Sequence, residues 1–229
     1  MKNGMINIIP LAVGAAIYGF AFGVLAAQLG FPWWGVALMS GLVHAGSSQI
    51  VAVERFATDG FLAGAVFAGL ALNLRYLGII ASLAPLFENI SLPKRLLAIH
   101  ITGDENWALT MAKRAKNTNV GYAFLVGSGL VMILTWVSST TLGAFIGNSI
   151  PNLADYGLGF AFTAAFIAMG RAMWRSKNDV VPWLVTFGIT ILLTKLNMAS
   201  AFAILVGSLS GLIIYILIPT INKVEKNDK

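Results

Sequence analysis

The chain of 229 residues contains no cysteine and only two histidines, and charged residues make up just 10% of it. The lack of cysteine excludes disulfides, iron–sulfur clusters, thiol redox chemistry and cysteine-rich zinc sites. The two histidines, His44 and His100, are too few for a histidine-rich metal site. We therefore expect no metal and no cofactor.

Apolar residues, by contrast, make up 58% of the sequence, and its mean hydropathy is +0.81. Average soluble domains carry about 25% charged residues, and a soluble domain of this length cannot bury so much apolar surface. The composition therefore predicts an integral membrane protein. In such a protein the net charge of +6 reports topology more often than nucleic-acid binding.

Seven apolar segments are candidates for spanning helices, each of which needs about 20 mostly apolar residues. They cover residues 8–29, 33–53, 61–87, 122–147, 158–173, 181–196 and 199–218. Between the third and fourth segments, residues 88–121 contain two short apolar pieces around a polar run, which predicts a helical hairpin at the membrane face. The sequence thus predicts an all-α polytopic membrane protein, one membrane domain over residues 1–229 with six to seven transmembrane helices. Six applies if the second segment is re-entrant and breaks at residues 45–48.

Lysine and arginine gather in three stretches outside these segments. They lie in the hairpin at residues 88–121, in the loop at residues 171–180 and in the charged tail at residues 222–229. Cytoplasmic loops of membrane proteins carry the excess of these residues. We therefore expect the hairpin, the loop and the C-terminus to be cytoplasmic.

Arg75 and its neighbour Asn73 lie well inside the third apolar segment. A charge at the bilayer centre costs roughly 2.5–3.5 kcal/mol on insertion scales. A buried partner or an aqueous cavity is therefore expected for Arg75. Its guanidinium either holds helices together through a fixed ion pair or binds a substrate carboxylate, whose planar shape it matches.

Four polar side chains and a glycine interrupt the second apolar segment, in the run His-Ala-Gly-Ser-Ser-Gln at residues 44–49. Discontinuous helices expose backbone groups that transporters use to hold substrate, and a helix N-terminus favours an anion. Ser47, Ser48 and Gln49 are therefore candidate substrate-binding residues, although such side chains also join helices without any substrate. His44 titrates near neutral pH when unperturbed, so it is a candidate proton relay or a hydrogen-bonded structural group.

Asp104 and Glu105 form an acidic pair before an apolar run in the predicted hairpin. If they fold into a vestibule, they can pair with Arg75, bind a substrate ammonium or carry a proton. Adjacent acids raise each other's pKa, which suits a proton carrier. The alternative is an exposed helix start, where the acids interact favourably with the helix dipole.

Four motifs in order carry a resemblance to a known family. They are Pro10 with Tyr-Gly-Phe-Ala-Phe-Gly-Val-Leu-Ala at 18–26, Met-Ser at 39–40 with Ala-Gly-Ser-Ser-Gln at 45–49, Leu-Asn-Leu-Arg-Tyr at 72–76 with Ala-Pro at 84–85, and the acidic pair at 104–105. In this order and spacing the chain resembles the AzlC/YgaZ family over nearly its whole length. That family comprises large subunits of branched-chain amino-acid exporters.

The resemblance implies a secondary exporter of valine, leucine, isoleucine or methionine in the bacterial inner membrane. It also implies a small membrane partner subunit of the AzlD/YgaH type. Our leading hypothesis is a proton-coupled exporter in which Ser47, Ser48, Gln49, Asn73 and Arg75 bind substrate. His44, Asp104 and Glu105 would then serve coupling or gating.

Two other classes of protein compete with this hypothesis. A channel, or a scaffold subunit of a membrane complex, would lack saturable dependence on a substrate. An enzyme is not expected, because the sequence shows no metal-ligand spacing, nucleophile elbow or phosphate loop.

Overall fold

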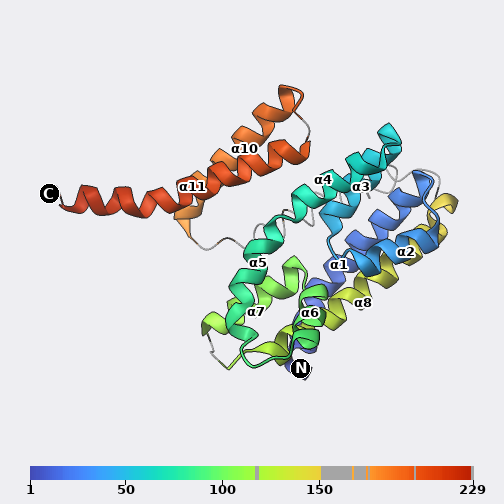
Figure 1. Ribbon diagram of the computed structural model, residues 1–229, viewed down its shortest axis with the longest axis horizontal. Coiled ribbons are helices and arrows are strands. Elements are labelled where there is room, and N and C mark those ends of the chain that lie inside the picture. Colours follow the sequence, from blue (N-terminus) through green and yellow to red (C-terminus); the bar gives the residue numbers. More distant parts are fainter. Residues whose placement is uncertain (117–118, 151–166, 168–173, 175, 199, 228–229) are drawn as a thin grey trace.

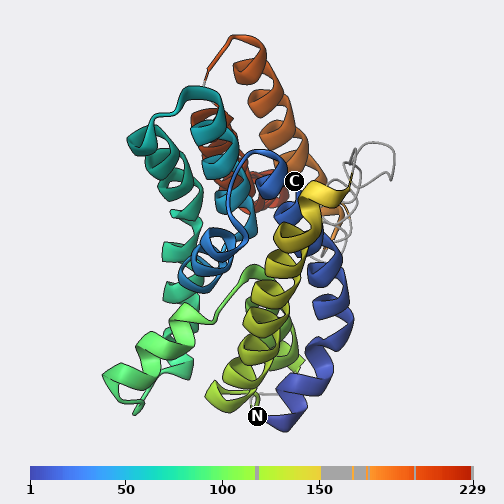
Figure 2. The same cartoon turned by 90° about the vertical axis from the view of Figure 1, so that its right-hand side faces the viewer.

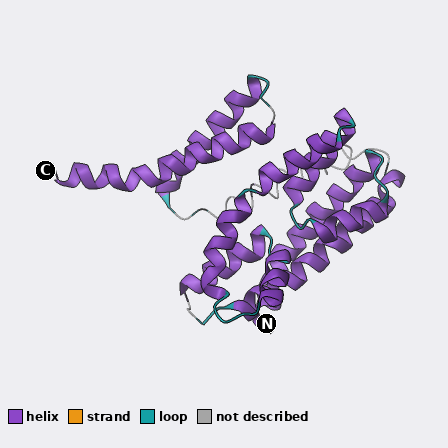
Figure 3. Ribbon diagram, viewed as in Figure 1, coloured by secondary structure: helices purple, strands orange, loops and turns teal. Residues whose placement is uncertain are grey.

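The computed structural model describes residues 1–116, 119–150, 167, 174, 176–198 and 200–227 (Figure 1). All regular structure in these residues is helical (Figure 3), which confirms the predicted all-α class. The fifth predicted segment, residues 158–173, lies outside the described residues except for Ile167.

The helices α1, Lys2–Gln28, and α8, Tyr122–Ile146, pack side by side along their lengths (Figure 2). Both are apolar and long enough to cross a membrane. Glycines let their backbones approach, as small residues do between membrane helices. A Cβ built on Gly23 would lie 2.1 Å from the Thr140 carbonyl oxygen, and one on Gly143 would lie 2.1 Å from the Phe20 carbonyl oxygen. The two helices form a central pair, with the most extensive helix–helix contact in the described part of the chain.

The second predicted segment is broken, as the polar run at residues 44–49 suggested. Helix α2, Trp33–Leu42, ends before His44, and α3, Gly46–Asp59, begins two residues after it. The short α2 packs on α8. The chain therefore places an irregular stretch of backbone, residues 43–45, against the central helix pair.

The third predicted segment is also broken, which its apolar sequence did not predict. Helix α4, Leu62–Asn73, and α5, Arg75–Leu83, meet at Leu74 with a bend of 40°. A short 3-10 turn, η1, Ala84–Leu86, follows α5. Asn73 and Arg75 thus stand on either side of the bend.

Two helices follow one another in the stretch for which the sequence predicts a hairpin. They are α6, Leu92–His100, and α7, Asp104–Lys116, and their arrangement as a hairpin at the membrane face stays a prediction. Pro93 lies in the first turn of α6, where its missing N–H is tolerated. Helix α7 starts with two acids and ends with three basic residues, which complements its dipole. It packs on both α1 and α8.

A helical hairpin, α10, Val180–Lys195, and α11, Ser200–Asn227, extends away from the other helices and contacts α4 (Figure 1). A short turn, η4, Lys177–Asp179, precedes it. Helix α11 continues into residues 222–227, so this part of the predicted charged tail is helical. Within the described ranges, two helices are both long and apolar enough to span a membrane, or three if α4 and α5 form one span. The count of six to seven crossings stays a prediction.

Candidate functional site

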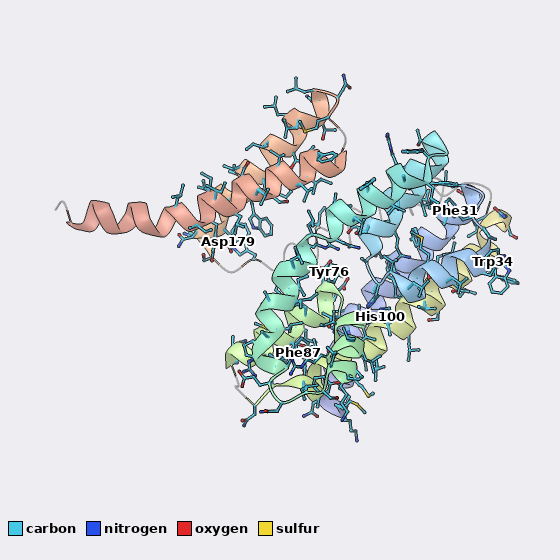
Figure 4. The ribbon with its side chains drawn as sticks, viewed as in Figure 1. Phe31, Trp34, Tyr76, Phe87, His100 and Asp179 are labelled. Carbon is cyan, nitrogen blue, oxygen red and sulfur yellow. The ribbon has the colours of Figure 1, made fainter. Side chains whose placement is uncertain are left out.

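The two helix breaks lie against each other. Ser48, in the first turn of α3, donates a hydrogen bond of 2.6 Å from its Oγ to Asn73 Oδ1 at the end of α4. Tyr76 on α5, which is labelled in Figure 4, donates from its hydroxyl to the His44 carbonyl oxygen, at 3.1 Å. Each break is therefore linked to the other by a side chain next to it.

The start of α3 offers free backbone donors. The first backbone hydrogen bond of this helix is donated by the Gln49 N–H to the Ala45 carbonyl oxygen. Among the described residues, no side chain caps the N-terminus of the helix. The N–H groups of Gly46, Ser47 and Ser48 thus have no acceptor within the helix. Together with the helix dipole they favour an anionic group.

Two polar atoms at this break are buried and have no hydrogen-bond partner in the described part of the chain. They are Ser47 Oγ and His44 Nδ1. Buried polar groups are nearly always paired, with protein or with another molecule. Both atoms are therefore available to a ligand or to water.

Arg75 forms an ion pair with Asp104, with 2.8 Å between Nη2 and Oδ2. The two side chains are 37% and 22% exposed, so the pair borders open space and is not sealed in the core. The guanidinium carbon also lies 5.6 Å from the centre of the Tyr76 ring, within cation–π range. The pair joins α5 to the start of α7. Pairing of Arg75 with the acids at 104–105 was one of the alternatives expected from the sequence.

Glu105 and His44 lie close to the same glycine. A Cβ built on Gly103 would lie 3.3 Å from Glu105 Oε2 and 3.3 Å from His44 Cε1. The Tyr18 side chain is within electrostatic range of Glu105, Arg75 and Asp104. The acidic pair therefore belongs to the same region as the α2–α3 break.

The acids titrate away from their usual range. Helix α7 is not one of the candidate spans. Burial, and then the charge of Asp104, raises the pKa of Glu105 to about 7. Burial also raises the pKa of Asp104, and the nearby Arg75 opposes this shift. Glu105 consequently changes charge near neutral pH, which suits a proton carrier.

Gln49 occupies a different place from Ser47. It is fully buried, and its amide oxygen accepts a hydrogen bond of 2.8 Å from the Trp136 indole nitrogen. Its amide nitrogen donates to Ser40 Oγ at 3.1 Å. Both ends of the predicted substrate-binding amide are thus engaged by protein groups.

The sequence did not point to Trp136, Thr140 or Ser40 as site residues, although all three are buried beside the break. Two weak signals were present: Ser40 belongs to one of the family motifs, and Trp136 and Thr140 are four residues apart and therefore on one face of α8. Within the described ranges, no group of three metal-binding side chains is present.

These features define a class of protein: an all-helical membrane protein whose discontinuous helices meet at a polar, partly exposed site, as in many transporters. The chain belongs to the AzlC family, because the family model described as "AzlC protein" matches residues 10–150.

Several curated relatives share this similarity. The inner membrane protein YgaZ of Escherichia coli is 25% identical over 218 residues, 92% of this chain and 89% of the relative. The branched-chain amino acid transport protein AzlC of Bacillus subtilis is 26% identical over 184 residues, 80% of this chain and 71% of the relative. An uncharacterized membrane protein of Archaeoglobus fulgidus is 28% identical over 214 residues, with 92% and 91% covered. No solved structure matches significantly.

Proposed function

We propose that this chain is a proton-coupled secondary transporter that exports valine, leucine, isoleucine and methionine across the bacterial inner membrane. The observation that carries the proposal is the uncapped start of α3, with the buried, unpartnered Ser47 Oγ, next to a break that also adjoins the acidic pair. The printed name of the Bacillus subtilis relative supports the substrate class.

In this proposal the substrate carboxylate binds at the start of α3. The N–H groups of residues 46–48 and the hydroxyl of Ser47 donate to it. The hydroxyl of Ser48 donates to Asn73 Oδ1 instead, and this bond holds Ser48 and its N–H group in place. Arg75 supplies the compensating positive charge once it leaves Asp104. Gln49 acts on the substrate through the orientation of this helix start.

The substrate ammonium is assigned to the acidic side of the site, at Asp104 and Glu105. The aliphatic side chain of the substrate then binds in apolar surroundings, which distinguish substrates only by the size of this side chain. Such surroundings discriminate one methylene by only about 1–3 kcal/mol. Several aliphatic amino acids should therefore compete for one site.

Coupling follows from the charge of Glu105. An ionised Glu105 attracts the substrate ammonium, and a protonated one does not, so the proton and the substrate bind alternately. This exchange is that of an exporter driven by inward proton movement. His44, whose ring lies near Glu105, and the Arg75–Asp104 pair serve as the gating groups.

We further propose that the hairpin at residues 88–121 and the C-terminus face the cytoplasm, and that the chain works with a small AzlD/YgaH-type membrane subunit. The orientation is supported by the excess of Lys and Arg in these stretches. The subunit is what the resemblance to the AzlC/YgaZ family implies.

Glu105→Gln should remove the pH dependence of substrate affinity. Glu105 has a pKa of about 7 and is ionised above it, so the apparent KM of the wild type should fall about tenfold from pH 6 to pH 8. The variant keeps the neutral, low-pH form and should show a high, constant KM. Glu88→Gln, a matched change at an exposed position, should keep the wild-type profile. A wild-type profile in Glu105→Gln would remove Glu105 from the coupling.

Equilibrium binding of labelled leucine to the purified protein tests the proposed site. Unlabelled valine, isoleucine and methionine should displace it, whereas leucinol, which lacks the carboxylate, and isocaproate, which lacks the amine, should not. Displacement by leucinol would contradict carboxylate recognition at α3. Absence of any saturable binding would favour a channel or scaffold subunit.

A further inference from the structure

A buried hydrogen-bonded network brackets the α2–α3 break. Ser40 lies near the end of α2 and Gln49 in the first turns of α3, so the two stand on opposite sides of the break. They are joined to each other at 3.1 Å, and both are fixed to α8, Gln49 by Trp136 and Ser40 by Thr140 at 2.9 Å. A single face of α8 therefore holds both half-helices.

The chemistry of the network fixes its direction. The indole N–H of Trp136 can only donate, so the oxygen of the Gln49 amide must face it. The amide nitrogen then faces Ser40, whose oxygen accepts from it. Ser40, Gln49 and Thr140 are 0% exposed and Trp136 is 4% exposed, so water does not substitute for a lost partner.

The ring of Trp136 also touches the first residue of α3. A Cβ built on Gly46 would lie 2.7 Å from Trp136 Cη2 and 2.7 Å from Tyr18 Cε1. The Trp136 ring in turn packs against Tyr18 and Phe22, with centroids 5.2 and 6.2 Å away. The start of α3 therefore packs directly against the closely packed rings of Tyr18 and Trp136.

We infer that Trp136 is a positioning residue of the transport site: its N–H, through Gln49, sets the direction in which the start of α3 presents its N–H groups and Ser47. This inference rests on the proposed function, because it assigns the substrate to that helix start. It also explains why Gln49, adjacent to the two serines, is buried and bonded to α8. Trp136 itself makes no contact with substrate in this account.

Trp136→Phe tests the role of the N–H, because it removes the donor and keeps an aromatic ring against Tyr18 and Phe22. Losing a buried partner should raise the KM for leucine at least about fivefold, with kcat changed less than twofold. Trp33→Phe, at an exposed Trp that contacts Phe145, is the matched control and should keep the wild-type KM. An unchanged KM in Trp136→Phe would overturn the inference.

The double variant Trp136→Phe/Gln49→Leu separates positioning from stability. In Trp136→Phe the buried Gln49 amide oxygen has lost its hydrogen-bond donor. The second substitution, Gln49→Leu, removes this amide, so the unfolding temperature should rise again toward that of the wild type. The KM should remain raised, because nothing then directs the start of α3. Recovery of both the unfolding temperature and the KM would show that Trp136 is only structural.

A readout independent of transport uses the absence of cysteine. Ser47→Cys introduces the only thiol of the chain, and its rate of reaction with a small methanethiosulfonate reports how the helix start is presented. Adding Trp136→Phe should change this rate severalfold, and adding Trp33→Phe should not. Equal rates would overturn the inference even if transport occurs. A changed rate without any saturable transport by the wild type would instead overturn the proposed function and retain the positioning.

Discussion

Arg75→Ala is expected to reduce transport by up to about 100-fold, because a hydrogen bond to a charged group, here the proposed one to the substrate carboxylate, contributes about 1.5–3 kcal/mol. The substitution removes the proposed carboxylate partner and leaves Asp104 without its 2.8 Å contact. Efflux of labelled leucine from proteoliposomes, normalised to folded protein, measures the effect. Lys94→Ala, at an exposed position on α6, is the control and should transport normally.

The double variant Arg75→Ala/Asp104→Ala distinguishes two roles of the ion pair. If the pair only joins α5 to α7, removal of both charges should restore much of the transport, because neither charge is left unpaired. Our account predicts that transport stays lost, since the substrate carboxylate still lacks its counter-charge. Restoration would reassign Arg75 to structure.

Gly143→Ala is expected to destabilise the protein by about 3 kcal/mol, the upper part of the usual range for overpacking. The new methyl group would lie 2.1 Å from the Phe20 carbonyl oxygen, and a backbone atom cannot move aside as a side chain does. Helices α1 and α8 would have to separate along their contact. Thermal unfolding in detergent measures the loss.

Gly14→Ala provides the matched control for this substitution. Gly14 lies in α1, the helix that Gly143 of α8 packs against, but a Cβ built on Gly14 has no atom within 4 Å. Its stability should match or slightly exceed that of the wild type, because alanine is the better helix former. Equal stability of both variants would contradict the close α1–α8 packing.

Hydropathy and polar interruptions predicted most of the elements. The apolar runs at residues 8–29 and 122–147 became α1 and α8, because long apolar helices are what a membrane requires. The polar cluster at residues 44–49 predicted the α2–α3 break, since polar side chains inside an apolar segment need partners. The same argument anticipated a partner for Arg75, and Asp104 was among the candidates.

Interactions between distant segments could not be predicted in this way. The bend at Leu74 lies between two polar residues, Asn73 and Arg75, but no proline or glycine marks it, and the bonds that surround it come from α3 and α7. The Trp136–Gln49 bond joins residues 87 apart in sequence. Hydrophobic periodicity contains no information about such pairings.

Efflux of labelled leucine from loaded liposomes, under an imposed inward proton gradient, tests the central claim most directly. The chain is reconstituted alone and together with a small AzlD/YgaH-type subunit. Our account predicts saturable efflux that the gradient accelerates and that Arg75→Ala abolishes. The account would be contradicted if both preparations, with the protein folded, released leucine no faster than loaded liposomes without protein.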